Sequence, residues 1–162
     1  MQSLSTGPNQ MPIYVIKPIT NGYIVSKQTQ LYMDDLMHQS KNGEGFKVGI
    51  IDSGICKNLK SQSNIIFINP NLYINKYTDE YDDHGHGTHI YGIIHQLIPS
   101  SKYYIAKALD DSGRISVNNV IVALKWMIEN NVHAINISML FRELPPNMYK
   151  KLTDLFKECY ET

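Results

Sequence analysis

The sequence predicts an α/β fold with three layers, in which helices cover both faces of a mostly parallel sheet. Four stretches rich in apolar, β-branched and aromatic residues are typical of buried strands, and they cover residues 46–52, 64–68, 102–109 and 133–140. Helical patterns of apolar residues lie between these strands and after the last one. This alternation favours a parallel sheet, because each connection between parallel strands has to cross one face of the sheet.

The first part of the chain is less regular than the rest. Residues 1–23 show little periodicity and are predicted to form an N-terminal extension, within which residues 13–19 could form a short strand. Apolar residues at helical spacing predict a short amphipathic helix over residues 29–39. We expect residues 24–162 to form one domain, because a chain of this length suits a single hydrophobic core.

Three further helices are predicted between and after the strands. Residues 89–98 are apolar on most sides, which predicts a buried helix. Residues 116–131 repeat apolar side chains at helical spacing, and Ser116 is suited to cap the first turn. Residues 145–161 begin with proline and then show the same spacing, which again favours a helix.

Composition excludes several classes of function. The chain has 15 lysine and arginine residues and 15 aspartate and glutamate residues. Because these charges balance, we expect that the protein binds neither nucleic acid nor a charged membrane. No apolar stretch is long enough to span a bilayer, and the first twenty residues do not read as a secretory signal. Cys56 and Cys159 are far apart and form no CxxC pattern, which is typical of free thiols in a reducing compartment. We therefore expect a cytoplasmic protein.

The stretch DDHGHGTHIYGII, residues 82–94, has three possible interpretations. His84, His86 and His89 could supply three imidazoles to a metal, but no HExxH arrangement is present and the glycines break the helical spacing that such a pair requires. The stretch could also be a polar loop without a chemical role. The third possibility is a catalytic histidine at the start of a helix, where flanking glycines leave room for a substrate.

The catalytic interpretation gains support from Asp52, which ends the predicted strand 46–52 in the sequence GIIDSG. Functional groups of parallel sheets gather at the carboxyl ends of the strands, and Gly54 allows the chain to turn away sharply there. A buried aspartate that holds one imidazole nitrogen selects the tautomer of the ring and stabilises its protonated form. These observations favour a contact between Asp52 and His86, but an Asp-Ser-Gly sequence at a strand end can also be structural, and the three interpretations stay open on the residues alone.

Three blocks taken together resemble the subtilisin-like serine peptidases. VGIIDSGI and DDHGHGTHIYG are similar to the Asp and His blocks of that family, whose His block reads HGTHVAG. The segment from Tyr103 to Met139 follows the family's order of strand, glycine-containing loop, helix and strand, and the resemblance covers about residues 28–158. It implies an incomplete subtilisin-like fold in which residues 24–162 are the N-terminal portion of the catalytic domain.

The resemblance also assigns roles to individual residues. Asp52 matches the aspartate of the catalytic triad and His86 its general base, whereas His89 matches a structural histidine and His84 matches no family motif. Metal binding is therefore not expected, and the family's calcium-binding loop has no counterpart after residues 89–98. We expect no cofactor.

Two further segments match the substrate-binding part of the family. The loop with Gly113, Arg114 and Ile115 corresponds to the loop whose backbone pairs with an extended polypeptide substrate, a mode of binding by β-augmentation. Ser138 and Met139 correspond to one wall of the substrate channel.

The 162 residues depart from the family in one decisive respect, because they contain neither a GTSMA-like block nor the oxyanion asparagine that precedes it. Ser53, Ser112 and Ser138 are expected in turns or pocket walls. We hypothesise a serine endopeptidase represented by its Asp and His half and inactive alone, which a second chain that supplies the Ser block could complete. Two alternatives stay open: a non-catalytic relative that binds extended peptides or a partner chain, and an unrelated α/β binding module.

Overall fold

A computed structural model of the chain describes residues 41–70, 81–141 and 144–161. The predicted N-terminal extension and the predicted helix over residues 29–39 lie outside the described residues. The described part contains four strands, and every pairing between them is parallel, which confirms the predicted fold class.

The sheet has the strand order β2-β3-β1-β4. Its strands are β1 (Lys47–Asp52), β2 (Ile65–Ile68), β3 (Lys102–Lys107) and β4 (Ala134–Ile137). The register places Asp52 opposite Lys107 on one side of β1 and Ile51 opposite Ile137 on the other. The carboxyl ends of the three strands β1, β3 and β4 therefore meet at one edge of the sheet.

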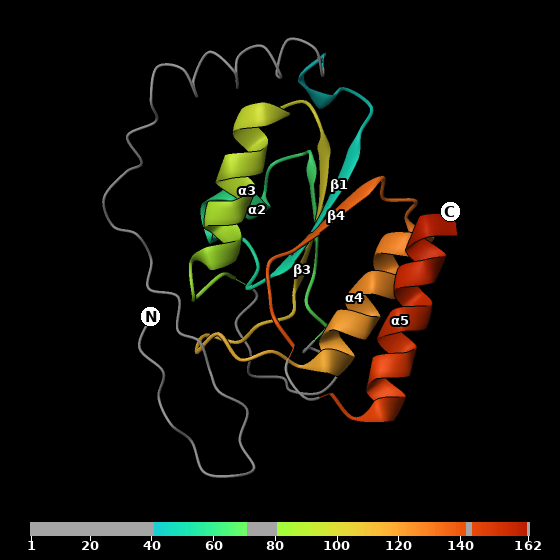
Figure 1. Ribbon diagram of the computed structural model, residues 1–162. Coiled ribbons are helices and arrows are strands. Elements are labelled where there is room, and N and C mark those ends of the chain that lie inside the picture. Colours follow the sequence, from blue (N-terminus) through green and yellow to red (C-terminus); the bar gives the residue numbers. More distant parts are fainter. Residues whose placement is uncertain (1–40, 71–80, 142–143, 162) are drawn as a thin grey trace, which may run out of the picture.

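Helices cover both faces of this sheet (Figure 1). The helical elements are a short 3-10 turn η1 (Lys41–Gly43), α2 (Lys57–Lys60), α3 (His86–Leu97), α4 (Val117–Glu129) and α5 (Pro146–Glu161). In Figure 1, α2 and α3 lie on one face of the sheet, and α4 and α5 lie side by side on the other. The arrangement has three layers, as the sequence predicts.

Side chains that alternate along the central strands build one core on each face. Ile50 and Ile105 pack toward α2 and α3, and both are fully buried. Their neighbours Ile51 and Ala106 pack toward α4 and α5, and they are also fully buried. Strands that bury both faces are apolar at most positions, which explains why the sequence shows long, mostly apolar runs.

The chain crosses the sheet three times between parallel strands. The connection from β1 to β2 uses the α2 face, and the connection from β3 to β4 uses the α4 face in the opposite direction across the sheet. These two crossovers have the same hand, which we take as the usual right hand of parallel connections. α3, which lies between β2 and β3 in sequence, packs on the α2 face, and the step from β2 to β3 moves toward β4, so the hand of this connection is the uncommon left one. It brings α3 into contact with β1.

Several boundaries differ from the sequence prediction. α3 begins at His86, three residues before the predicted start, and Ile93 is 41% exposed, so the prediction of a buried helix is wrong on its outer side. The third and fourth strands end before their predicted limits, at Lys107 and Ile137. Ser116 occupies the N-cap position of α4 but makes no capping hydrogen bond with its side chain. The short helix α2 was not predicted.

Substitution by alanine should have opposite effects on stability at two glycines of α3. A Cβ atom on Gly87 would lie 2.4 Å from the carbonyl oxygen of Gly54, whereas one on Gly92 would meet no atom within 4 Å. Gly87→Ala should lower the free energy of unfolding by about 1–3 kcal/mol through overpacking. Gly92→Ala should raise it by about 0.5–1 kcal/mol, because alanine favours the helix. Chemical denaturation of both variants measures the effects, and equal shifts would contradict the close approach of α3 to β1.

Candidate active site

Asp52 is the last residue of β1, and its side chain is fully buried. The Ser53 amide donates a hydrogen bond of 2.7 Å to Asp52 Oδ1. Gly54 follows with φ 108°, a conformation that L side chains rarely adopt, and it lets the chain leave the sheet edge at once. The carboxylate is thus held at the carboxyl end of the strand, where the sequence analysis places it.

His86 is the first residue of α3 and faces Asp52. Its Nδ1 atom lies 2.8 Å from Oδ1 and 2.9 Å from Oδ2 of Asp52, so the predicted contact is confirmed. An ionised carboxylate can only accept, so Nδ1 carries the hydrogen and Nε2 has the free lone pair. The His86 side chain is 16% exposed, whereas the Asp52 side chain is fully buried. The arrangement can accept a proton at Nε2 and stabilise the imidazolium that results.

The start of α3 is attached directly to the turn after β1. The Gly87 amide donates a hydrogen bond of 2.9 Å to Ser53 Oγ, and Gly87 contacts the backbone of Gly54. The Thr88 hydroxyl accepts a hydrogen bond from the Cys56 amide at 3.0 Å. The first turn of the helix therefore packs against the segment that carries Asp52.

Asp82 is a residue of this site that the sequence analysis missed. Its Oδ1 atom accepts hydrogen bonds from Ser53 Oγ at 2.8 Å, from the Gly85 amide at 2.7 Å and from the His84 amide at 3.2 Å. Its Oδ2 atom accepts from the amide and the hydroxyl of Thr88. Burial acts to raise the pKa of Asp82, but the hydrogen bonds from Thr88, Gly85 and Ser53 outweigh it and hold the pKa below its ordinary value.

Lys107 is a second residue that the sequence analysis missed. It ends β3 opposite Asp52, and only 2% of its surface is exposed. Its Nζ atom donates hydrogen bonds to the Tyr81 carbonyl oxygen and, at 2.9 Å, to Asp83 Oδ2. A buried lysine needs such partners, because burial without them disfavours its charge. The lysine thereby fixes the segment that precedes His86.

His84 lies between His86 and the loop that follows β3. The two imidazole rings are 6.2 Å apart between centroids and meet edge to face. On its other side, His84 Nε2 lies so close to Gly113 that a Cβ atom there would be 3.0 Å away. Within the described residues, the buried His84 Nδ1 atom has no hydrogen-bond partner. The structure thus places Gly113 beside the histidine pair, which spacing in the sequence does not reveal.

The loop that contains Gly113 is folded back on itself. The Asp110 amide donates to the Arg114 carbonyl oxygen, and the Gly113 amide donates to the Asp110 carbonyl oxygen, each at 3.0 Å. The Arg114 amide donates to Asp110 Oδ1 at 2.9 Å, and Ile115 forms an antiparallel bridge with Leu109. Both backbone polar groups of Arg114 are therefore used inside the loop, which restricts how an extended peptide could pair with it.

Ser138 and Met139 follow β4 at the same edge of the sheet. Ser138 comes directly after Ile137, the register partner of Ile51, and its hydroxyl donates to Asn136 Oδ1 at 2.9 Å. Met139 packs against the core on the α4 side. These two residues thus follow the strand that neighbours β1, and the Gly113 loop follows the strand on the other side of β1.

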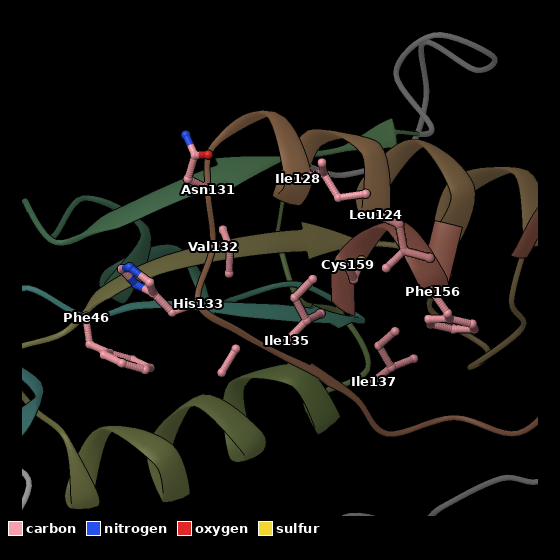
Figure 2. Close-up of a pocket in the computed structure, with 11 residues that line it drawn as sticks. Phe46, Leu124, Ile128, Asn131, Val132, His133, Ile135, Ile137, Phe156 and Cys159 are labelled. Atoms are coloured by element: carbon pink, nitrogen blue, oxygen red, sulfur yellow. The ribbon is translucent and has the colours of Figure 1, made fainter. Parts of the chain in front are cut away.

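A groove runs along β4 on the α4 and α5 side, with a volume of about 710 Å³. It is lined by Phe46, Leu124, Ile128, Asn131, Val132, His133, Ala134, Ile135, Ile137, Phe156 and Cys159. Figure 2 shows the side chains of α4 and α5 on one side of this groove and those of β4 on the other. Among the described strands, β4 pairs only with β1. The groove therefore borders a strand with one free edge.

Two other features are absent from the described residues. Over residues 41–70, 81–141 and 144–161, no three His, Cys, Asp or Glu side chains are grouped so that they could hold a metal ion. Within the same described part of the chain, no helix combines the length and the apolar character that a bilayer crossing requires.

Sequence comparison identifies relatives of this chain. The model of the subtilase family matches residues 43–157. A thermostable alkaline protease of Halalkalibacterium halodurans is 32% identical over 106 residues, which cover 60% of this chain and 28% of that protein. Subtilisin E of Bacillus subtilis is 31% identical over 121 residues, which cover 68% of this chain and 31% of that protein.

Structure comparison gives a consistent result for the fold. The crystal structure of a cold-adapted subtilisin-like serine proteinase matches with a TM-score of 0.56 at 20% sequence identity. The match covers 72% of this chain and 44% of that one. The chain thus spans less than half the length of each of these relatives. The family model covers most of the chain, and we conclude that the protein belongs to the subtilase family.

Proposed function

We propose that this chain supplies the aspartate and the general base of a subtilisin-like serine endopeptidase, and that it hydrolyses peptide bonds only together with a segment that carries the Ser block. The observation that carries the proposal is the contact of His86 Nδ1 with both carboxylate oxygens of Asp52, at 2.8 and 2.9 Å. The need for a further segment follows from the absence of a GTSMA-like block among the 162 residues.

The proposed chemistry uses His86 Nε2 as the base. As a serine hydroxyl attacks the scissile carbonyl carbon, its proton passes to Nε2, and Asp52 stabilises the imidazolium that forms. The same proton then passes to the leaving amine. Asp52 and His86 supply the proton transfer, whereas the nucleophile and the donors to the oxyanion have to come from the other segment.

We propose an extended polypeptide as the substrate, bound between two segments at the carboxyl edge of the sheet. One is the loop with Gly113, Arg114 and Ile115, and the other contains Ser138 and Met139. The contact of Gly113 with His84, whose ring meets that of His86, supports the first placement. Because both backbone polar groups of Arg114 bond within the loop, a peptide has to pair with the groups of its neighbours.

We further propose that the Ser-block polypeptide, as a second chain, adds a parallel strand to β4. α4 and α5 lie on the same face of the sheet, and the step from β3 to β4 moves away from β2. In a right-handed arrangement the next strand of the fold after α5 lies on the free side of β4, and the strand of the second chain would take that place. Side chains of such a strand would enter the groove beside Ile135 and Ile137. An unpaired apolar edge strand also tends to associate with other chains.

We propose a cytoplasmic location for the protein. Cys56 and Cys159 are both free thiols in the structure, and such thiols are typical of reducing compartments. Fractionation of the producing cells, followed by detection with an antibody against this chain, measures the location. Recovery of the protein mainly outside the cells would contradict the proposal.

We expect the isolated chain to neither cleave casein nor react with a fluorophosphonate probe, and to self-associate through β4. Adding a separately expressed subtilase fragment with the oxyanion asparagine and a GTSMA-like block should restore both activities. In that complex, Asp52→Asn should lower kcat about 10⁴-fold and His86→Ala about 10⁶-fold. Asp154→Asn, which changes an exposed carboxylate of α5, serves as the matched control.

The outcomes of this experiment separate the candidate functions. A monodisperse chain that digests casein alone would contradict the need for a second segment. A complex that forms but never cleaves, with intact binding of extended peptides, would favour the non-catalytic relative.

If the Ser-block fragment binds in the groove along β4, substitution of two aromatic residues of α5 should affect its binding differently. Phe156 lines the groove and is 39% exposed, whereas Tyr149 is 64% exposed and is not a lining residue. Phe156→Ala should raise the Kd for the Ser-block fragment at least tenfold, because burying such a side chain contributes about 1.5–3 kcal/mol. Tyr149→Ala should leave the Kd within about twofold. Isothermal titration measures both, and equal effects would place the interface elsewhere.

A further inference from the structure

The amino end of α3 requires an external cap. The first amides of a helix have no partner within the helix, and a side chain at the N-cap usually accepts one of their hydrogen bonds. The N-cap of α3 is Gly85, with φ 87°, and it has no side chain that could do so. Asp82 performs this function from three residues upstream, because its Oδ2 atom accepts the Thr88 amide at 2.8 Å.

The other oxygen of Asp82 connects this cap to the strand that carries Asp52. Oδ1 accepts from the Gly85 amide and from Ser53 Oγ, at 2.7 and 2.8 Å. Ser53 Oγ in turn accepts the Gly87 amide at 2.9 Å. The Ser53 hydroxyl therefore binds both Asp82 and Gly87, the second residue of α3. Ser53 thus connects two segments in addition to its predicted place in a turn.

The hydrogen bonds form a closed circuit around His86. The Ser53 amide donates to Asp52 Oδ1, Asp52 accepts from His86 Nδ1, and the backbone leads from His86 to Gly87, whose amide returns to Ser53. We infer that Asp82, acting through Ser53 and the first turn of α3, is a positioning residue that holds His86 Nδ1 against Asp52. The inference rests on the proposed function, because it gives Asp82 a task in proton transfer rather than in folding alone.

Position matters here because the base acts only over hydrogen-bond distances, and a displacement of about 1 Å can lower a catalytic rate about 10²-fold. α3 is exposed along its outer side, so the packing of that side cannot determine the position of its first residue. Lys107 holds Tyr81 and Asp83, the residues on either side of Asp82. Among the described side chains, Ser53 accepts a hydrogen bond from the Gly87 amide and Asp82 accepts one from the Thr88 amide, both in the first turn of α3.

Asp82→Asn is the informative substitution, because it keeps the shape of the side chain and changes its charge and its hydrogen-bonding capacity. All five groups around the carboxylate are donors: the amides of His84, Gly85 and Thr88 and the hydroxyls of Ser53 and Thr88. An asparagine offers one accepting oxygen, and its NH₂ group would face donors at the other position. The variant should lose the hydrogen bonds of one oxygen, and therefore either those to Ser53, Gly85 and His84 or those to Thr88.

The depressed pKa of Asp82 predicts how this effect depends on pH. The stabilisation that an ionised Asp82 contributes should be complete above the unfolded-state pKa of about 3.8 and should be lost as the pH falls through the lower folded-state pKa. The difference in unfolding midpoint between the wild type and Asp82→Asn, measured in urea from pH 7 to pH 2.5, should therefore shrink below about pH 4. A difference that does not change with pH would contradict an ionised Asp82.

The direct test is NMR spectroscopy of the full chain with ¹⁵N-labelled histidines. The wild type should show a slowly exchanging, deshielded proton on His86 Nδ1, and Asp154→Asn should retain it. In Asp82→Asn and Ser53→Ala, its exchange rate should rise at least tenfold while the methyl signals of Ile50 and Ile105 report an intact core. If Asp82→Asn does not fold, Ser53→Ala decides the outcome, because it removes a single hydroxyl.

The results distinguish this inference from the proposed function. An unchanged His86 signal in both folded variants would overturn the positioning role and leave the proposed function standing. A wild type without a protected Nδ1 proton would overturn the Asp52–His86 pair itself, and therefore both. In the complex with the Ser-block fragment, Asp82→Asn should lower kcat about 10–100-fold with KM nearly unchanged, because substrate binding does not involve Asp82.

Discussion

The contact between a buried carboxylate at the end of β1 and an imidazole at the start of α3 constrains the surrounding backbone. Asp52 and His86 are brought to 2.8 Å only because two segments of main chain approach closely at Gly54 and Gly87. A side chain on Gly87 would prevent that approach. The buried pair is favourable because the carboxylate accepts both the imidazole and the Ser53 amide, which compensates for its removal from water.

The left-handed crossover through α3 makes this contact possible. It places α3 over β1 although the helix connects β2 to β3, so His86 meets a strand that is not its neighbour in sequence. The other face of the sheet has a regular arrangement, with α4 and α5 packed together over the larger core. The two faces thus differ in what they contribute: the α3 face supplies the reactive pair, and the α5 face borders the free edge of β4.

Much of the fold could be predicted from local patterns, but the ends of its elements could not. Runs that are apolar at most positions identify β1 and β3, because both strands bury side chains on two faces. The start of α3 was predicted three residues late, because its first turn is HGT, which has no apolar periodicity and is capped by Asp82 and Ser53. A single apolar helix pattern also does not reveal how much of its surface the rest of the chain covers, so the prediction of a buried helix fails at Ile93.

The amino-acid sequence alone determined the class of fold and the pair Asp52 and His86, because strand-forming runs and the DSG and HGTH motifs are local and can be read without coordinates. The tertiary structure decided which residues surround that pair. Asp82 reaches Ser53 across 29 residues of sequence, and Lys107 reaches Asp83 across 24. Such contacts depend on the order of the strands and the face on which each helix packs, which are properties of the whole chain folded around its two cores.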